Sequence, residues 1–175
     1  TLLAVVGLSL FLQSCVNDLD VVPEGETQLS VEEFYAQPGS YKQALGGVYG
    51  NLSLTGTSGA ESSNIGGIDA GTSQYGRALW YLQNLSTDEV IWSYENDPGT
   101  REIQRNIWSA SNPVIRGMFS RATYQVALVN EYLRQTEPSV LSGRGVTDAQ
   151  TLSDIQLYRK EARALRALAY YHLMD

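Results

Sequence analysis

The 175-residue chain is 43% hydrophobic and 18% charged, which excludes wholesale disorder and allows one domain of ordinary size with a real core. Its net charge of −7 at pH 7 makes nucleic acid, which rewards clustered Lys and Arg, a poor partner. A single cysteine, Cys15, excludes an intrachain disulfide.

The chain opens with an apolar run over residues 2–12. The run is too short to span a bilayer but fits the hydrophobic region of a secretory signal. Leu12-Gln13-Ser14-Cys15 then resembles a bacterial lipobox, in which the Cys thiol is acylated and becomes the first residue of the mature chain. The alternative is a plain signal peptide with a chance Cys. We expect a lipoprotein signal over residues 1–15, lipidation at Cys15 and a location outside the cytoplasm.

Residues 16–28 are polar, acidic and punctuated by Pro23 and Gly25, which indicates a flexible tether. The acidic side chains of this tether would be repelled by an anionic leaflet, so the folded body is expected to be held off the membrane. The folded domain is expected over residues 29–175.

Two helix starts follow the tether. Ser30 and Glu33 form a capping box that predicts a short helix to about Gln37, and Ser40 with Gln43 forms a second. The second helix carries apolar residues at helical spacing: Tyr41, Leu45, Val48, Tyr49 and Leu52. It also contains three glycines, at 46, 47 and 50, which are unfavourable inside a helix. Either a neighbouring backbone comes very close there, or this helix depends on tertiary packing.

Residues 55–76 are rich in Gly, Ser and Thr and lack periodicity, so this long loop is either functional or disordered. A short apolar piece follows over 77–84. Ser86-Thr87-Asp88-Glu89 then has the composition of a helix cap with acids on the first turn. A catalytic use of Asp88 and Glu89 is rejected, because sequence neighbours in a helix point about 100° apart.

Residues 90–99 are short, aromatic and turn-rich, with Trp92 and Tyr94 beside Asn96 and Asp97. A carbohydrate site uses this combination, because a ring stacks on the sugar face while amides and carboxylates bind its hydroxyls. The alternative is a helix ending in a turn with its rings packed inward. The chain has eleven Tyr and three Trp, and core packing is the commoner use of any single ring.

Two long amphipathic helices complete the chain. Asn112-Pro113 is a helix start, and an apolar stripe runs on to Leu133 and ends before Pro138; its members are Ile115, Met118, Phe119, Ala122, Val126, Val129 and Leu133. Residues 139–150 read as a polar connection, and the final helix is expected from Ser153 or Asp154. Two such helices predict an antiparallel hairpin of the kind that stacks in helical repeats. No strand pattern of any strength is present, so the predicted fold class is all-α.

The final helix becomes apolar on more than one face, which predicts burial on several sides. Its sole histidine, His172, is expected to be a packed core residue rather than a metal ligand or general base. The sequence gives no sign of a cofactor or metal site. The helix has no stop signal before Asp175, and the chain has no initiator Met, so we expect an N-terminal fragment.

In this order, the lipobox, the helix at 41–49, the segment 86–90, the helix at 112–133 and above all residues 161–173 resemble the N-terminal part of the SusD/RagB family. These are surface lipoproteins of glycan-uptake systems in Gram-negative bacteria. The resemblance implies a scaffold of tetratricopeptide-like helical hairpins with long irregular loops, here incomplete at its C-terminus. Tyr170 and Tyr171 are interpreted as core.

The resemblance also implies a function without catalysis: binding polysaccharide or oligosaccharide at the outer membrane and delivering it to a TonB-dependent transporter of the SusC type. The implied partners are therefore that transporter, a glycan, and the membrane through the lipid anchor. Candidate ligand-binding residues in the part present are Arg77, Trp92, Tyr94 and Asn96. A helical scaffold that binds mainly the transporter is the alternative. A surface hydrolase is disfavoured, because the lone His and the lack of a convincing acid pair leave it without machinery.

Overall fold

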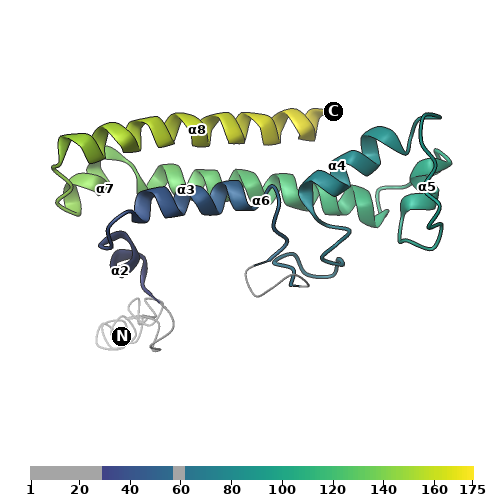
Figure 1. The fold of residues 1–175 in the computed structure, drawn as a ribbon, viewed down its shortest axis with the longest axis horizontal. Coiled ribbons are helices and arrows are strands. Elements are labelled where there is room, and N and C mark those ends of the chain that lie inside the picture. Colours follow the sequence, from purple (N-terminus) through teal and green to yellow (C-terminus); the bar gives the residue numbers. More distant parts are fainter. Residues whose placement is uncertain (1–28, 57–61) are drawn as a thin grey trace, which may run out of the picture. The chain divides into compact units, whose positions relative to one another are not determined.

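The computed structural model describes residues 29–56 and 62–175 (Figure 1). The expected signal with Cys15 at 1–15 and the tether at 16–28 lie outside the described residues. Within the described ranges the secondary structure consists of helices α2 to α8, with no strand. The all-α prediction is confirmed. The chain divides into two units, residues 1–38 and 39–175, and each is described by itself.

The described part of the first unit contains α2 (Val31–Tyr35). Its predicted capping box is confirmed: the Glu33 backbone N–H donates to Ser30 Oγ at 3.2 Å, and the Ser30 N–H donates to Glu33 Oε2 at 2.8 Å. These hydrogen bonds from Ser30 lower the pKa of Glu33. The helix ends at Tyr35, two residues before the predicted Gln37.

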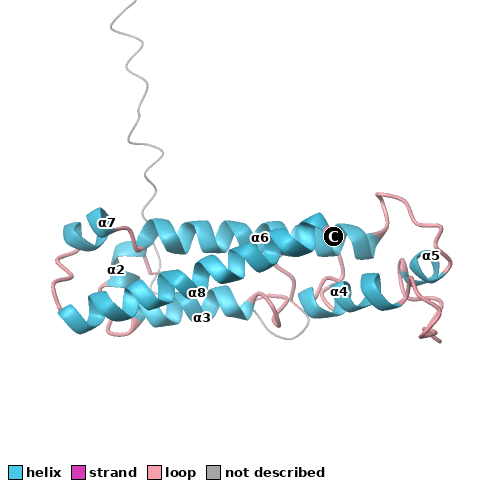
Figure 2. Ribbon diagram, turned by 90° about the horizontal axis from the view of Figure 1, so that it is seen from above, coloured by secondary structure: helices cyan, strands magenta, loops and turns pink. Residues whose placement is uncertain are grey.

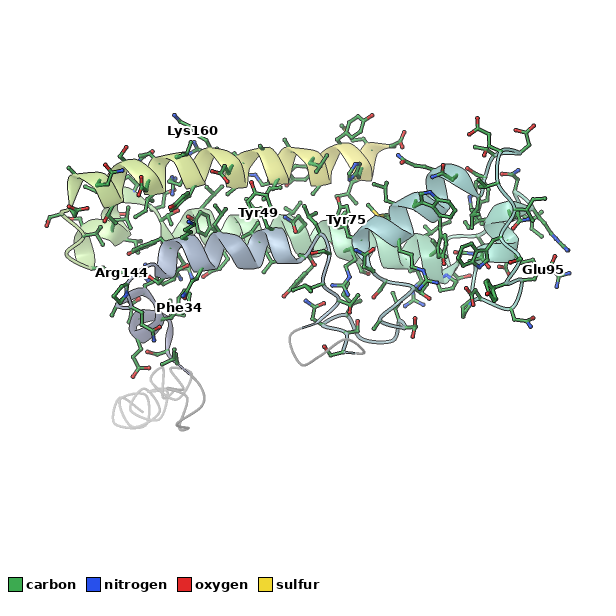
Figure 3. The ribbon with its side chains drawn as sticks, in the orientation of Figure 1. Phe34, Tyr49, Tyr75, Glu95, Arg144 and Lys160 are labelled. Carbon is green, nitrogen blue, oxygen red and sulfur yellow. The ribbon has the colours of Figure 1, made fainter. Side chains whose placement is uncertain are left out.

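The second unit is built on the predicted antiparallel hairpin. Helix α6 (Pro113–Gln135) packs along α8 (Ala149–Met174), α3 (Ser40–Gly50) packs against both, and α4 (Tyr75–Asn84) packs against α6 (Figures 1 and 2). The short α5 (Thr100–Gln104) follows α4, and α7 (Pro138–Gly143) lies within the predicted polar connection. Tyr49 of α3, which Figure 3 labels, donates to Glu161 Oε2 of α8 at 2.9 Å, and that carboxylate raises the pKa of Tyr49.

Helix α8 starts earlier than Ser153 because Asp148 caps it. Asp148 Oδ2 accepts from the Thr151 N–H and from Thr151 Oγ1, both at 2.7 Å. The predicted start of α6 is confirmed, since Asn112 Oδ1 accepts from the Val114 N–H at 2.9 Å. Proline at the next position costs no hydrogen bond there.

Helix α6 contributes to two core clusters. Its first half meets α4 in a cluster of Tyr75, Ala78, Tyr81, Leu85, Ile103, Val114, Met118 and Ala122. Its second half meets α3 and α8 in a cluster of Leu45, Val48, Val129, Tyr132, Leu133, Ala162 and Leu165. The predicted stripe is wrong at Phe119, which is 61% exposed, because it lies about 100° round the helix from buried Met118.

Two predicted caps are wrong. The second capping box fails because Gly39, with φ of 77°, is the N-cap of α3, while Ser40 lies inside the helix and is fully buried. The segment at 86–89 caps no helix start. Instead Ser86 Oγ donates to Leu82 O at 2.8 Å, and Thr87 Oγ1 donates to Asn84 O at 2.7 Å. These hydroxyls satisfy carbonyls at the end of α4.

The surroundings of the glycines in α3 distinguish a close neighbouring backbone from dependence of this helix on tertiary packing. A Cβ added at Gly46 or Gly47 would meet no atom within 4 Å, so no close backbone explains them. The helix therefore depends on tertiary packing through its buried residues Tyr41, Leu45 and Val48.

We expect Gly47→Ala to raise the free energy of unfolding by about 1 kcal/mol, because Ala restricts the unfolded chain and fits the helix. Gly99→Ala is the contrasting variant. Gly99 has φ of 83°, and its added Cβ would lie 2.8 Å from Asn112 Oδ1, so this change should destabilise. Urea unfolding of both variants tests the pair, and a neutral or destabilising Gly47→Ala contradicts the reading of α3.

The final helix is buried on one side only, which corrects the expectation of burial on several sides. Its buried residues are Ile155, Arg159, Ala162, Leu165 and Ala169. Its exposed large residues are Leu157, Leu168, Tyr170, Tyr171 and Met174, so the assignment of Tyr170 and Tyr171 to the core is wrong here. Leu157, Leu168 and Tyr171 fall on the side opposite the buried residues at helical spacing. We call these three residues the outer face of α8; Lys160, on the same side, points away from the bundle (Figure 3).

Two arginines hold the end of α6. Arg159 of α8 is buried and donates from Nη1 to Leu133 O at 2.7 Å and to Thr136 Oγ1 at 2.8 Å. Its Nη2 donates to Glu137 Oε1 at 2.9 Å. Arg144 donates from Nη1 to Gln135 O at 2.9 Å. The last carbonyls of α6, which the helix itself leaves unpaired, are satisfied in this way.

Candidate functional site

The candidate site is carried by α4 and by the segments on either side of it. Gln74 caps α4, since its Oε1 accepts from the Arg77 N–H at 2.5 Å. Tyr75, Ala78 and Tyr81 recur at three-residue spacing and are buried against α6. This register leaves Arg77 and Trp80 on the exposed side of the helix.

Four rings join α4 to the segment after it, and we call them the aromatic patch: Trp80, Tyr81, Trp92 and Tyr94. Trp92 is central, with ring centroids 5.1 Å from Tyr81, 6.2 Å from Trp80 and 5.8 Å from Tyr94. The rings are edge-on or tilted, as aromatic pairs prefer. Tyr81 is 2% exposed and Tyr94 is 68% exposed, so the patch runs from the core to solvent.

Arg77 and Asp97 flank the patch. Arg77 donates from Nε to the Tyr81 hydroxyl at 2.6 Å, and its guanidinium lies 5.2 Å from the Tyr81 ring centroid. Asp97 Oδ2 accepts from Trp92 Nε1 at 3.0 Å and lies 3.7 Å from Arg77 Nη2. Both charged side chains are about two-fifths exposed, at 42% and 40%. The terminal N–H groups of Arg77 make no hydrogen bond to any described residue.

The structure brings together three of the four predicted site residues: Arg77, Trp92 and Tyr94. Asn96 is exposed and makes no side-chain hydrogen bond within the described ranges, whereas its neighbour Asp97 joins the group. No helix covers 90–99, so the alternative of a helix ending in a turn is wrong, although Trp92 does pack against the core. Trp80 and Tyr81 were not among the predicted site residues, because residues 77–84 were identified only as a short apolar piece.

The long loop before α4 is fixed to the core by Arg121 of α6. This arginine is 0% exposed. Its Nε donates to Ser73 O at 2.6 Å, and its Nη2 donates to Thr55 O at 2.8 Å and to Ser73 Oγ at 3.2 Å. Its Nη1 donates to Asn64 Oδ1 at 2.5 Å and to Asn51 Oδ1 at 3.3 Å. The described parts of the loop are therefore ordered against the core, and burial lowers the pKa of Arg121.

A cavity of about 600 Å³ lies between this loop and α4. Its lining is residues 53–56, Gly71, Gln74 and Arg77. Gln74 joins the two walls, because its Nε2 donates to Leu52 O at 3.0 Å. Nearby Asp69 accepts from the Thr72 N–H at 2.9 Å; this hydrogen bond, together with the positive charge of Arg77, lowers the pKa of Asp69.

The geometry fits a flat ligand rich in hydroxyl groups. Exposed rings offer an apolar face, and the Arg77–Asp97 pair offers donors and an acceptor beside it.

Among the described residues no group of His, Cys, Asp and Glu could hold a metal ion. His172 lies on α8, half-buried, with Nδ1 2.8 Å from the hydroxyl of Tyr75, which Figure 3 labels. None of the described helices combines the length and hydropathy needed to cross a bilayer.

Comparison with known proteins adds one relative. No family model matches the chain. The chain is 32% identical over 170 residues to the starch-binding protein SusD of Bacteroides thetaiotaomicron, and this alignment covers 96% of the chain and 27% of that protein. The chain thus spans 27% of the length of the relative that it matches.

Proposed function

Since this chain belongs to the SusD-like family, we propose that it supplies the aromatic patch of a non-catalytic glycan-binding protein. The relative is named for starch, so a starch-type oligosaccharide is the first ligand to test. One observation supports the proposal most strongly. Arg77 of α4 lies beside Trp92, Tyr94 and Asp97 of the segment that follows α4, and the four residues form one surface.

Each part of this surface has a distinct role in the proposal. Tyr94 stacks on one face of a sugar ring, and Trp92 supports it from behind while being held by Asp97. The terminal N–H groups of Arg77, which make no hydrogen bond to a described residue although Nη2 lies 3.7 Å from Asp97 Oδ2, donate to sugar hydroxyls, and Asp97 accepts from them. Charge-assisted hydrogen bonds of this kind are stronger than neutral ones.

The cellular setting is also part of the proposal. Lipidation at Cys15 anchors the protein at the cell outer membrane, and a SusC-like TonB-dependent transporter takes the glycan inward. The relative and the lipobox sequence support these statements together. In this proposal the protein binds a glycan and does not catalyse a reaction on it.

A second function, docking on the transporter or another protein without a glycan of its own, has one observation in its favour. The outer face of α8 exposes Leu157, Leu168 and Tyr171 at helical spacing. Glycan binding distinguishes the two functions, because the scaffold alternative predicts no glycan that binds tightly and selectively.

Tyr94→Ala in the full-length protein should weaken oligosaccharide binding at least about tenfold, the loss of roughly 1.4 kcal/mol expected for one stacked ring. Tyr171→Ala is the matched control, since Tyr171 is an exposed tyrosine of α8 and not a member of the aromatic patch. Calorimetric titration with maltoheptaose measures both. Equal affinities of Tyr94→Ala and wild type would rule out the aromatic patch as the site.

A further inference from the structure

Gln74, the residue that precedes the first turn of α4, is an unusual residue type for its position. Helices most often begin at Ser, Thr, Asp or Asn, whose short side chains accept from the first N–H groups of the helix. Gln74 caps α4 with a longer side chain, since its Oε1 accepts from the Arg77 N–H at 2.5 Å. Capping alone therefore does not account for a glutamine at this position.

The nitrogen of the same side-chain amide makes a second connection. Gln74 Nε2 donates to Leu52 O at 3.0 Å and to Ser53 O at 3.4 Å. These carbonyls follow the end of α3 at Gly50, so one side chain links the end of α3 to the start of α4. A carboxylate cannot donate, and Ser, Thr and Asn have shorter side chains, so the amide of a glutamine meets both requirements.

The start of α4 is fixed from a second direction by the buried Arg121 of α6. Arg121 Nε donates to Ser73 O at 2.6 Å, directly before Gln74, and Arg121 Nη2 donates to Ser73 Oγ at 3.2 Å. Gln74 is half-buried, and a Cβ added at Gly76 would lie at the ordinary contact distance of 3.5 Å from Gln74 Oε1. The backbone before α4 is thus bonded to α6, while the cap is bonded to the end of α3.

The first turn of α4 carries Arg77, the cation of the candidate site. The cap accepts from the backbone N–H of Arg77 itself, and Arg77 Nε donates to the Tyr81 hydroxyl at 2.6 Å. The ion pair with Asp97 is long, at 3.7 Å, and both of its side chains are about two-fifths exposed. An exposed pair of this kind contributes too little to fix a side chain by itself. The placement of the guanidinium therefore depends on where the first turn of α4 is held.

We propose that Gln74 is a positioning residue of the glycan site. By linking the start of α4 to the end of α3, it holds the Arg77 guanidinium beside Tyr81 and Asp97. The proposal rests on the proposed function. The effect of Gln74 on binding passes through Arg77, because a first turn that is free to shift no longer holds the donors of Arg77 ready for sugar hydroxyls.

Gln74→Ser in the full-length protein separates the two connections. Ser is a good N-cap, so α4 stays capped, but the shorter side chain does not reach Leu52 O. We expect this variant to bind maltoheptaose about tenfold more weakly in calorimetric titration, as when one hydrogen bond to a charged group is lost, with a urea midpoint close to that of wild type. Gln83→Ser, the same substitution at an exposed position near the other end of α4, is the matched control and should bind as wild type does.

A double-mutant cycle shows whether the effect passes through Arg77. In an Arg77→Ala background, Gln74→Ser should cause no further loss of affinity. An equal loss in both backgrounds, or an unchanged affinity of the single variant Gln74→Ser, overturns the positioning role in binding. Should Gln74→Ser not fold, Gln74→Asn, a strong N-cap with an amide one methylene shorter, must show the same loss that depends on Arg77.

A measurement without glycan separates this proposal from the proposed function. The Arg77 Nε–H is bonded to the Tyr81 hydroxyl, and NMR of the arginine side chains should show it exchanging with solvent about tenfold faster in Gln74→Ser than in wild type. If wild type binds no oligosaccharide while this exchange changes as expected, the proposed function falls and the positioning of Arg77 by Gln74 stands. Unchanged exchange overturns the positioning whether or not a glycan binds.

Discussion

Arg121→Met is expected to lower the free energy of unfolding by about 3 kcal/mol, because it removes the donor from several buried acceptors at once. Ser73 O and Asn51 Oδ1 are the buried acceptors that lose their partner, and Thr55 O loses one as well. Met fills a similar volume, so the loss reports on hydrogen bonding rather than on a cavity. Because the variant no longer has to bury a charged guanidinium, its loss of unfolding free energy should be smaller than the summed contributions of the hydrogen bonds that Arg121 makes.

The effect of this variant should be greatest in the loop. Amide hydrogen exchange over residues 62–74 should speed up far more than exchange in the middle of α8. Arg116→Met, which changes an exposed arginine on the same helix, is the control and should alter neither stability nor exchange. If Arg121→Met unfolds with the wild-type urea midpoint, the hydrogen-bonded cluster around Arg121 contributes nothing measurable.

Arg159→Met should cost about 3 kcal/mol by the same mechanism at the end of α6. It removes the Arg159 donor from Thr136 Oγ1 and from Leu133 O, which keeps only the longer hydrogen bond from Thr136 Oγ1 at 3.3 Å, and it removes the ion-pair partner of Glu137. Arg163→Met, one turn further along α8 and exposed, is the control. Thermal unfolding of the two variants gives the comparison, and equal melting temperatures would contradict a capping role for Arg159.

The two buried arginines should differ in their effect on the candidate site. The hydrogen bonds of Arg159 to described residues go to the end of α6 and to Glu137, so its variant should leave the exchange of residues 62–74 and the affinity for glycan unchanged. The Arg121 variant should change both. A glycan affinity that falls equally in the two variants would indicate a general loss of folded protein.

The helical framework could be predicted because its signals are local. Asn112-Pro113, the Ser30–Glu33 box and the apolar periodicity of α6 each act within a turn or two of helix. The failures at Ser40 and at 86–89 are also local: short polar residues that can cap a helix start can equally lie inside a helix or bond to the end of the preceding one.

Arg121 could not be predicted, because an arginine on a long amphipathic helix is normally solvated. Its acceptors lie 48 to 70 residues away in the sequence, at the end of α3 and in a loop without periodicity. Whether Asn96 or Asp97 contacts the aromatic patch could not be predicted for a similar reason. Both side chains have the right chemistry, and only the fold shows that Asp97 reaches the indole of Trp92. Burial of α8 on several sides was expected because apolar residues occupy more than one of its faces, but the helix is buried on one side.

The packing of Trp80 against Trp92 gives this chain a built-in spectroscopic probe. Two of its three tryptophans lie with ring centroids 6.2 Å apart and planes at 61°, close enough for their electronic transitions to couple. The near-ultraviolet circular dichroism of the chain should therefore carry a signal that changes sign or size when either indole tilts. Emission from Trp92, whose N–H is bonded to Asp97, should respond when a ligand competes for that carboxylate. Binding can then be followed without a label.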